Sequence, residues 1–314
     1  MSHHPNRLIR GLHNLPAVER GSVVTIGTFD GVHLGHQAII NQVTHQAKKM
    51  DLPSVAVIFE PQPQEYFAGG EAPARLMRFR EKVLALFEAG IDRVLCVPFN
   101  ESFRALDAQQ FIDRVLVKGL GLKYLVVGDD FRFGCDRSGD YKGLHAAGEQ
   151  LGFTVTDTHT LELKGERISS TRVRSELEAG HFDAAAALLG KPYTIAGRVI
   201  YGQQLGRQLG VPTANVLLRR YRSPLRGVFA IKARLSEGQA FLGVANVGVR
   251  PTVGAADRPI LEVHLFDFAQ DIYGQNLEVE FCHKLRDEQK FDSLDQLKAQ
   301  IFADIDAAKH ILNH

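Results

Sequence analysis

The first half of the chain alternates short apolar runs with segments of helical periodicity. The apolar runs lack polar alternation, which is typical of strands buried on both faces of a sheet. Strands are predicted at 22–27, 54–59, 93–99, 124–128 and 153–158. The segments between them place apolar residues at helical spacing, as Ile39, Ile40 and Val43 do. Repeated strand–helix units predict an α/β domain with a doubly wound, parallel, Rossmann-like sheet.

The pattern changes after Pro192, where glycine becomes frequent and the predicted strands become shorter. Antiparallel strands are predicted at 194–200, 227–235, 239–248, 260–268 and 277–285. A closing helix is predicted from the capping box of Ser293 and Gln296, with Ile301 and Ile305 on its apolar face. We therefore expect two domains. An α/β domain covers 1–186, and a small antiparallel β-barrel with a C-terminal helix covers 187–314.

Composition and charge fit an ordinary globular protein. The chain has 314 residues, of which 45% are hydrophobic and 23% charged, and a formal net charge of +1. This near-neutral charge argues against nucleic acid or a membrane surface as a partner. The N-terminus has no apolar segment typical of a secretory signal, and no run reaches membrane-spanning length, so a cytoplasmic location is expected. The sequence does not indicate an oligomeric state.

Two histidines lie where the first predicted strand gives way to a helix. The stretch TFDGVHLGHQAII (28–40) contains His33 and His36, with Gly35 between them. A helix N-terminus attracts anions, and imidazole donors placed there can stabilise phosphate charge. Gly35 would let a phosphate or a flat base approach the backbone. Two histidines alone cannot complete a zinc site. A phosphate site is therefore favoured over a metal, with ordinary surface histidines as the alternative.

The stretch ISSTRVR (168–174) is a second candidate for phosphate binding. Ser169 or Ser170 can cap the helix that follows, and Arg172 and Arg174 flank the same N-terminus. Hydroxyls, free N–H groups and guanidinium groups together could hold a triphosphate. The alternative is a plain N-cap with solvated arginines.

Two aromatic loops follow predicted strands of the first domain. GDDFRFG (128–134) and FEPQPQEYF (59–67) both lie where the carboxyl ends of parallel strands place ligand-binding loops. Their phenylalanines could stack on a planar ring system. Aromatic residues that merely fill the core beneath a loop are an equally good interpretation.

The second half carries its own candidate chemistry. GQQLGRQLGVPTANV (202–216) is glycine-rich, and its Thr213 and Asn215 offer the oxygen ligands that Mg²⁺ prefers. A turn before a strand, with a satisfied asparagine, is the alternative. Glu262 and His264 would share one face of a predicted strand, where a carboxylate could accept a proton from an attacking hydroxyl. A solvated charge on an open sheet face is the alternative for a lone glutamate.

These motifs, in this order, resemble the bacterial bifunctional riboflavin kinase/FAD synthetase family. In the first half, GTFDGVHLGH, FEPQP, GDDFRFG and ISSTRVR resemble the adenylyltransferase module. In the second half, GRQLGVPTAN, ANVGVRPT, LEVHLFDF and KLRDEQKF resemble the riboflavin kinase module. The resemblance covers nearly the whole chain. It implies phosphorylation of riboflavin by ATP with Mg²⁺ to give FMN, followed by adenylylation of FMN by a second ATP to give FAD.

The resemblance also implies roles for particular residues. Glu262 would take the ribityl hydroxyl proton, whereas His33, His36 and Arg172 would act on the ATP phosphates in adenylyl transfer. The implied ATP-binding residues are Gly27, Phe29, Gly35, Ser170 and Thr171 in the first domain, and Gly202, Gly206 and Thr213 in the second. The implied Mg²⁺ ligands are Thr213 and Asn215. The implied flavin-binding residues are Pro61, Asp130, Phe131, Phe133 and Arg286.

A few positions depart from the family pattern. Gln62 stands where many relatives have histidine, Phe229 where tyrosine is common, and Asp130 where some have asparagine. Two other functions compete with the bifunctional enzyme. One is an adenylyltransferase with a degenerate barrel, against which the intact PTAN stretch and Glu262 argue. The other is a flavin-binding regulator or RNA-binding protein, and the absence of a basic aromatic stripe argues against RNA.

Overall fold

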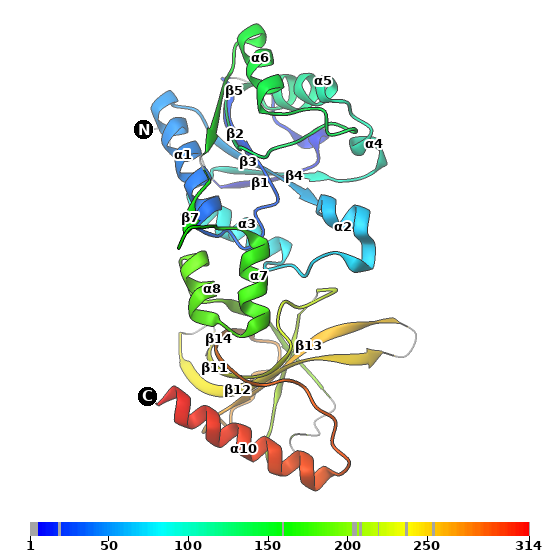
Figure 1. The fold of residues 1–314 in the computed structure, drawn as a ribbon, viewed down its shortest axis with the longest axis vertical. Helices are drawn as coiled ribbons and strands as arrows, with labels where there is room; N and C mark the ends of the chain where they lie inside the picture. Colours follow the sequence, from blue (N-terminus) through cyan, green and yellow to red (C-terminus); the bar gives the residue numbers. More distant parts are fainter. Residues whose placement is uncertain are drawn as a thin grey trace. The chain divides into compact units, whose positions relative to one another are not determined.

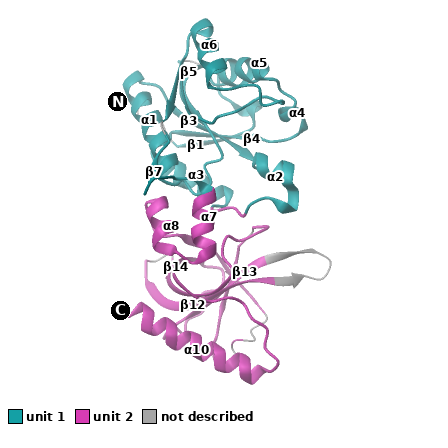
Figure 2. Ribbon diagram, in the orientation of Figure 1, with its two compact units in different colours: residues 1–73, 77–170 teal, residues 74–76, 171–314 magenta. Residues whose placement is uncertain are grey.

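The computed structural model describes residues 6–17, 20–158, 160–202, 206, 209–218, 220–235, 238–252 and 255–313. The chain divides into two compact units, 1–73 with 77–170, and 74–76 with 171–314 (Figure 2). This division assigns the whole of 171–189 to the second unit, whereas the sequence predicted a boundary at 186. Among the described residues, no helix is long and apolar enough to cross a membrane.

The first unit is built on a parallel sheet of six strands in the order β1-β4-β3-β2-β5-β6 (Figure 1). Its strands are β1 (Arg7–Arg10), β2 (Ser22–Ile26), β3 (Ser54–Glu60), β4 (Arg93–Pro98), β5 (Leu122–Gly128) and β6 (Thr154–Thr158), with a small hairpin of β7 (Glu162–Leu163) and β8 (Glu166–Arg167). Its helices are α1 (Leu34–Met50), α2 (Pro63–Ala68), α3 (Phe79–Glu88), α4 (Glu101–Arg104), α5 (Ala108–Phe111) and α6 (Tyr141–Leu151). The predicted parallel sheet is confirmed. The edge strand β1, which pairs with β4, was not predicted.

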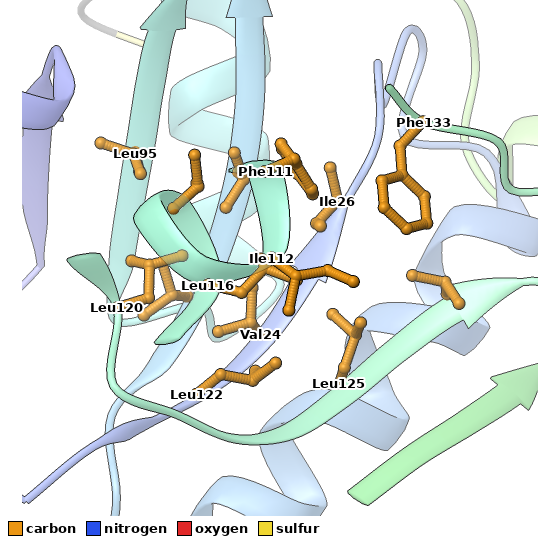
Figure 3. Packing of buried hydrophobic residues seen from close by; sticks show 14 of the residues in the cluster. Val24, Ile26, Leu95, Phe111, Ile112, Leu116, Leu120, Leu122, Leu125 and Phe133 are labelled. Atoms are coloured by element: carbon orange, nitrogen blue, oxygen red, sulfur yellow. The ribbon is translucent and has the colours of Figure 1, made fainter. Parts of the chain in front are cut away.

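Both faces of this sheet are buried, which explains the unbroken apolar runs. Val23 packs on one face with α1 and α3, whereas Val24 packs on the other. On the second face, Phe111, Ile112 and Leu116 lie against Val24 (Figure 3). Helix α5 has Asp107 as its N-cap, with the capping box to Gln110 formed, and continues as a π-helix over Ile112–Gly119.

The second unit begins with helices α7 (Ser170–Ala179), whose first residue belongs to the first unit, and α8 (Phe182–Leu189). Six antiparallel strands then form a closed barrel in the order β10-β13-β12-β11-β14-β9. Their bounds are β9 (Thr194–Ile200), β10 (Ala214–Leu217), β11 (Gly227–Leu235), β12 (Ala240–Thr252), β13 (Ala255–Leu265) and β14 (Asn276–Arg286). The predicted barrel is confirmed, and it also contains β10, which is not among the predicted strands.

The last helix, α10 (Leu294–Leu312), packs on the outer face of the barrel. Ser293 accepts the Gln296 N–H, as the capping pattern predicts. Ile305 and Ala308 of α10 pack with Val211, Ala230 and Phe266 from the barrel unit. Strand alternation therefore sorts the barrel side chains. Those such as Val247 and Leu261 fill the interior, and those such as Val244 and Glu262 line a cavity bordered by α10.

Candidate functional sites

The first site lies at the start of α1, after β2. His33 is itself the N-cap of this helix, because its Nδ1 accepts the backbone N–H of His36 at 3.3 Å. The two imidazole rings are stacked, with centroids 3.7 Å apart and planes 17° apart. The ring of Phe29 lies against His36 at 5.1 Å. The predicted pair of histidines is thus one aromatic stack at a helix N-terminus.

His36 is electrically neutral near pH 7. Burial lowers its pKa well below the usual value, and the adjacent His33 ring and the ammonium of Lys82 lower it further. The Nδ1 atom of His36 is buried and has no hydrogen-bond partner among the described residues. His36 can therefore offer a ring N–H or a lone pair to a ligand but not a full positive charge.

Two glycines beside the stack leave space for its aromatic rings. A Cβ at Gly35 would lie 3.2 Å from the His33 ring and 3.4 Å from the carbonyl oxygen of Ile168. A Cβ at Gly27 would lie 3.1 Å from the Phe29 ring. Both ring contacts are tighter than ordinary van der Waals packing, so the absence of a side chain lets the rings occupy these positions.

The loop after β2 also reaches the second predicted phosphate motif. The Ser170 hydroxyl donates to the carbonyl oxygen of Asp30 at 2.8 Å. The Asp30 carboxylate, buried in turn, accepts the Met77 N–H at 3.1 Å. The start of ISSTRVR therefore lies beside TFDGVH, two motifs far apart in sequence. Thr171 and Arg172 fall in the second unit, and their proposed roles stay predictions.

The predicted flavin residues of the first unit lie in loops at the carboxyl ends of β3 and β5. Asp130 is paired with Arg167 at 2.8 Å, and Pro61 is exposed. Phe131 stacks on Phe133 with centroids 5.6 Å apart. Phe133 is only 8% exposed and packs into the core against Phe111 (Figure 3). Phe131, which is half-buried, is thus the better placed of the two phenylalanines to touch a ligand.

The second site is a cavity of about 290 Å³ on the outer face of the barrel. It brings together five of the six predicted kinase residues, Gly206, Thr213, Asn215, Glu262 and Arg286, whereas Gly202 does not line it. One part of its wall is apolar and includes Val211, Val244, Leu297 and Ile301. The polar groups lie mainly on β10, β12 and β13 and on the segment after β14.

The glycines before β10 fit closely against the polar groups of this cavity. A Cβ at Gly202 would overlap the side-chain amide of Asn215. A Cβ at Gly206 would overlap the carbonyl oxygen of Val211 and lie 3.2 Å from the Thr213 hydroxyl. Both glycines therefore permit the backbone to pass directly over the two predicted Mg²⁺ ligands.

The strand face that carries Glu262 also carries a histidine, which holds the glycine-rich segment in place. His264 lines the cavity, and its Nδ1 bonds to the carbonyl oxygen of Pro212 at 2.8 Å. Because a carbonyl only accepts, the proton must lie on Nδ1. The contact holds the residue immediately before Thr213 to the strand that carries Glu262.

Arg286 is held rigidly at the edge of the cavity. Its guanidinium forms a bidentate pair with Asp304 of α10, with N–O distances of 3.0 and 2.8 Å. Its carbon centre also lies 5.8 Å from the ring of Phe291. Asp304, Asn246 and Glu288 line the same cavity and were not singled out from the sequence. No local pattern marks them, since they lie on three separate segments.

Orphaned acceptors test whether Mg²⁺ suits this cavity. The Oδ1 atom of Asn215 is buried without a hydrogen-bond partner among the described residues, and Thr213 adds a hydroxyl. Neutral oxygens of this kind suit a Mg²⁺ ion whose other ligands are phosphates and water. In the described part of the chain, no group of three or more His, Cys, Asp or Glu residues could hold a metal. The residues present fit a phosphate-bound ion.

Comparison with known proteins assigns a family to each half of the chain. A family model described as FAD synthetase matches residues 15–172, and one described as riboflavin kinase matches 189–312. A "Bifunctional riboflavin kinase/FMN adenylyltransferase" of Pseudomonas fluorescens is 54% identical over 96% of this chain and 97% of its own. The Haemophilus influenzae protein of that name is 50% identical over 98% and 99%. Neither family model covers 173–188, so the predicted boundary at 186 stays a prediction.

Among solved structures, a Streptococcus pneumoniae protein described as a macrolide-efflux protein has the same fold. Its TM-score is 0.79 at 30% identity, and the match covers 95% of this chain and 97% of that one. The match extends over both the parallel-sheet unit and the barrel unit.

Proposed function

The chain belongs to the family of bifunctional riboflavin kinases/FMN adenylyltransferases, and we propose which of its residues carry out each reaction. The C-terminal unit phosphorylates riboflavin to FMN, and the N-terminal unit joins FMN to AMP to give FAD. The observation that carries the assignment of residues is the clustering of Gly206, Thr213, Asn215 and Glu262 around one cavity.

In the kinase step, Glu262 is the base. The ribityl hydroxyl oxygen attacks the γ-phosphorus of ATP, the new O–P bond forms, and the bond to the departing ADP oxygen breaks. The hydroxyl proton passes to a carboxylate oxygen of Glu262, because a neutral alcohol is a weak nucleophile until it loses its proton. Thr213 and Asn215 would hold Mg²⁺, which when bound neutralises phosphate charge. Gly202 and Gly206 let the backbone lie close to Asn215 and Thr213.

The apolar part of the cavity suits the flavin ring. Val211, Leu297 and Ile301 offer a hydrophobic surface, and Arg286 presents a planar guanidinium fixed by Asp304. The ring would lie against this surface, with the ribityl chain directed to Glu262. The fixed guanidinium loses little entropy on binding, which favours its use in orienting the substrate.

Adenylyl transfer requires no base. A phosphate oxygen of FMN attacks the α-phosphorus of ATP, and pyrophosphate leaves with the bridging oxygen. Since the nucleophile is already anionic, alignment and charge stabilisation are sufficient. The stack of His33 and His36 would contact the ATP phosphates, and the lowered pKa of His36 supports a role in hydrogen bonding for that residue. Ser170, Thr171 and Arg172 would steady the departing pyrophosphate.

FMN would bind beside the loops after β3 and β5. We assign ring contact to Phe131 and the edge of the site to Pro61 and Asp130. Phe133 supports Phe131 from the core through their stacked rings. Gly27, Phe29 and Gly35 would shape the nucleotide side of the same site.

The test is to incubate the protein with riboflavin, ATP and Mg²⁺ and to separate the flavins chromatographically. Glu262→Ala should make no FMN from riboflavin but should convert supplied FMN to FAD. His36→Ala should stop at FMN. Glu278→Ala and His45→Ala change exposed residues on β14 and α1 and are the matched controls. Both should form FMN and FAD as wild type does. Loss of both activities in one folded variant would contradict the assignment of separate sites.

A further inference from the structure

Three polar side chains form a row across adjacent barrel strands. Glu262 of β13 is directly opposite Asn215 of β10 on one side and Asn246 of β12 on the other. Directly opposite residues in antiparallel strands project on the same face, with Cβ atoms about 5 Å apart. All three residues line the cavity. The row therefore reads Asn215, Glu262, Asn246, with the proposed base in the middle.

Asn246 has an unused hydrogen-bond acceptor. Its Oδ1 atom is buried and has no partner among the residues that the structure describes. The side chain cannot turn away from the cavity, because its neighbours Ala245 and Val247 fill the barrel interior on the opposite face. A buried acceptor left without a donor carries a desolvation penalty, which a ligand's O–H or N–H would relieve.

The position of Asn246 in the row decides which ligand group it meets. Thr213, Asn215 and the two glycines all lie on the β10 side of Glu262, where the phosphates and Mg²⁺ are proposed to bind. Asn246 lies on the β12 side. Two residues further along β12, a Cβ at Gly248 would overlap the Glu288 carboxylate, which belongs to the segment after Arg286. Asn246 thus lies on the side of the proposed flavin.

We infer that the Oδ1 atom of Asn246 accepts a hydrogen bond from a ribityl hydroxyl next to the one that is phosphorylated. This inference rests on the proposed kinase site. A substrate hydroxyl that reaches Glu262 from the flavin side must bring the rest of its polyol chain past β12. Holding a neighbouring hydroxyl there aligns the reacting oxygen with both the base and the γ-phosphorus. Asn246 is then a specificity residue for a polyol substituent on the flavin ring.

The experiment pairs variants with substrate analogues. Asn246→Ala and Asn246→Ser are assayed for the kinase step with riboflavin and with flavins that each lack one non-reacting ribityl hydroxyl. With riboflavin, Asn246→Ala should lower kcat/KM about tenfold, the effect of one lost hydrogen bond. With one analogue, wild type and Asn246→Ala should be equal, because that analogue has already lost the contact. Asn246→Ser, which retains an acceptor, should recover part of the loss with riboflavin.

Two outcomes would overturn the inference. If Asn246→Ala loses the same factor with every analogue, no ribityl hydroxyl is involved. If raised Mg²⁺ restores its activity, Asn246 acts on the cation instead. The unfolding temperature of Asn246→Ala and its conversion of FMN to FAD should match those of wild type. If Asn246→Ala is unstable, the same analogues are compared with Asn246→Ser. Failure of the wild-type protein to phosphorylate riboflavin would contradict the proposed function itself. The wild-type reaction shows this outcome independently of the Asn246 variants.

Discussion

Single positions in this protein control how close two chemical groups can come. Gly202 is the sharpest case, because a side chain there would overlap the amide of Asn215. We predict that Gly202→Ala lowers the rate of FMN formation about tenfold or more, since overpacking of about 1–3 kcal/mol would displace a proposed Mg²⁺ ligand. The apparent affinity for Mg²⁺ should fall with it. The measurement is kinase activity as a function of Mg²⁺, and unchanged conversion of FMN to FAD is the internal control.

His36 should make stability depend on pH. Its folded-state pKa lies below that of the unfolded chain, which is about 6.5. Above that pH the residue is neutral in both states. As the pH falls below the unfolded-state pKa, His36 is protonated in the unfolded chain but not in the folded protein. The free energy of unfolding therefore decreases until the folded-state pKa is reached.

We therefore predict that His36→Gln flattens the fall in stability between about pH 6.5 and the lowered folded pKa. Urea unfolding followed by circular dichroism at several pH values measures this. His45→Gln, on the exposed side of the same helix, is the matched control and should retain the wild-type slope. A slope unchanged by His36→Gln would show that other groups cause the pH dependence.

At the scale of elements, α10 contributes both a wall of the kinase cavity and the anchor of Arg286. We predict that Asp304→Asn raises KM for riboflavin and lowers the free energy of unfolding by about 1–3 kcal/mol. The buried amide cannot replace a charge-assisted bidentate pair, and the guanidinium would lose its fixed orientation. Asp306→Asn, exposed on the same helix, is the matched control. An unchanged KM with lowered stability would limit Asp304 to a structural role.

Long apolar runs and strong caps made most elements predictable from the sequence. The five predicted strands of the first unit, β2 to β6, and the cap of α10 form where the sequence pattern places them. The strand β1 was missed because Arg7–Arg10 has charged residues at both ends and gains its pairing only from β4. The strand β10 was missed because its four residues follow a glycine- and proline-containing turn. In both cases a distant partner defines the strand.

The sites show the same limit. Motif order identified Glu262, Thr213 and Asn215, and the structure gathers these residues around one cavity. Asn246 lies in a run that looks like a plain strand, and only the register of β12 against β13 places it beside Glu262. For Phe133 the sequence left flavin contact and core packing as alternatives, and tertiary packing against Phe111 buries its ring in the core. Contacts between distant segments, which no local pattern encodes, account for both differences.

At the scale of the whole molecule, the two proposed sites use different chemistry, and FMN links them as the product of one and a substrate of the other. One uses a carboxylate to deprotonate an alcohol, and the other aligns an anionic nucleophile with ATP and stabilises the charge of the phosphates. A defect in one site should therefore leave the other competent, provided that FMN made by one chain can reach another. We predict that a mixture of Glu262→Ala and His36→Ala proteins converts riboflavin to FAD, although neither does so alone.

This mixing experiment measures more than the presence of two sites. The His36→Ala protein makes FMN, which must dissociate before the intact adenylyltransferase site of the Glu262→Ala protein can use it. FAD should therefore appear after a lag that shortens as the His36→Ala protein is increased. A protein that binds free FMN is then added as a trap. It should suppress FAD formation by the mixture more than FAD formation by wild type only if FMN passes between the two sites of one wild-type chain without being released. FMN that accumulates in the mixture while FAD stays absent would contradict independent sites and would require FMN transfer within one chain.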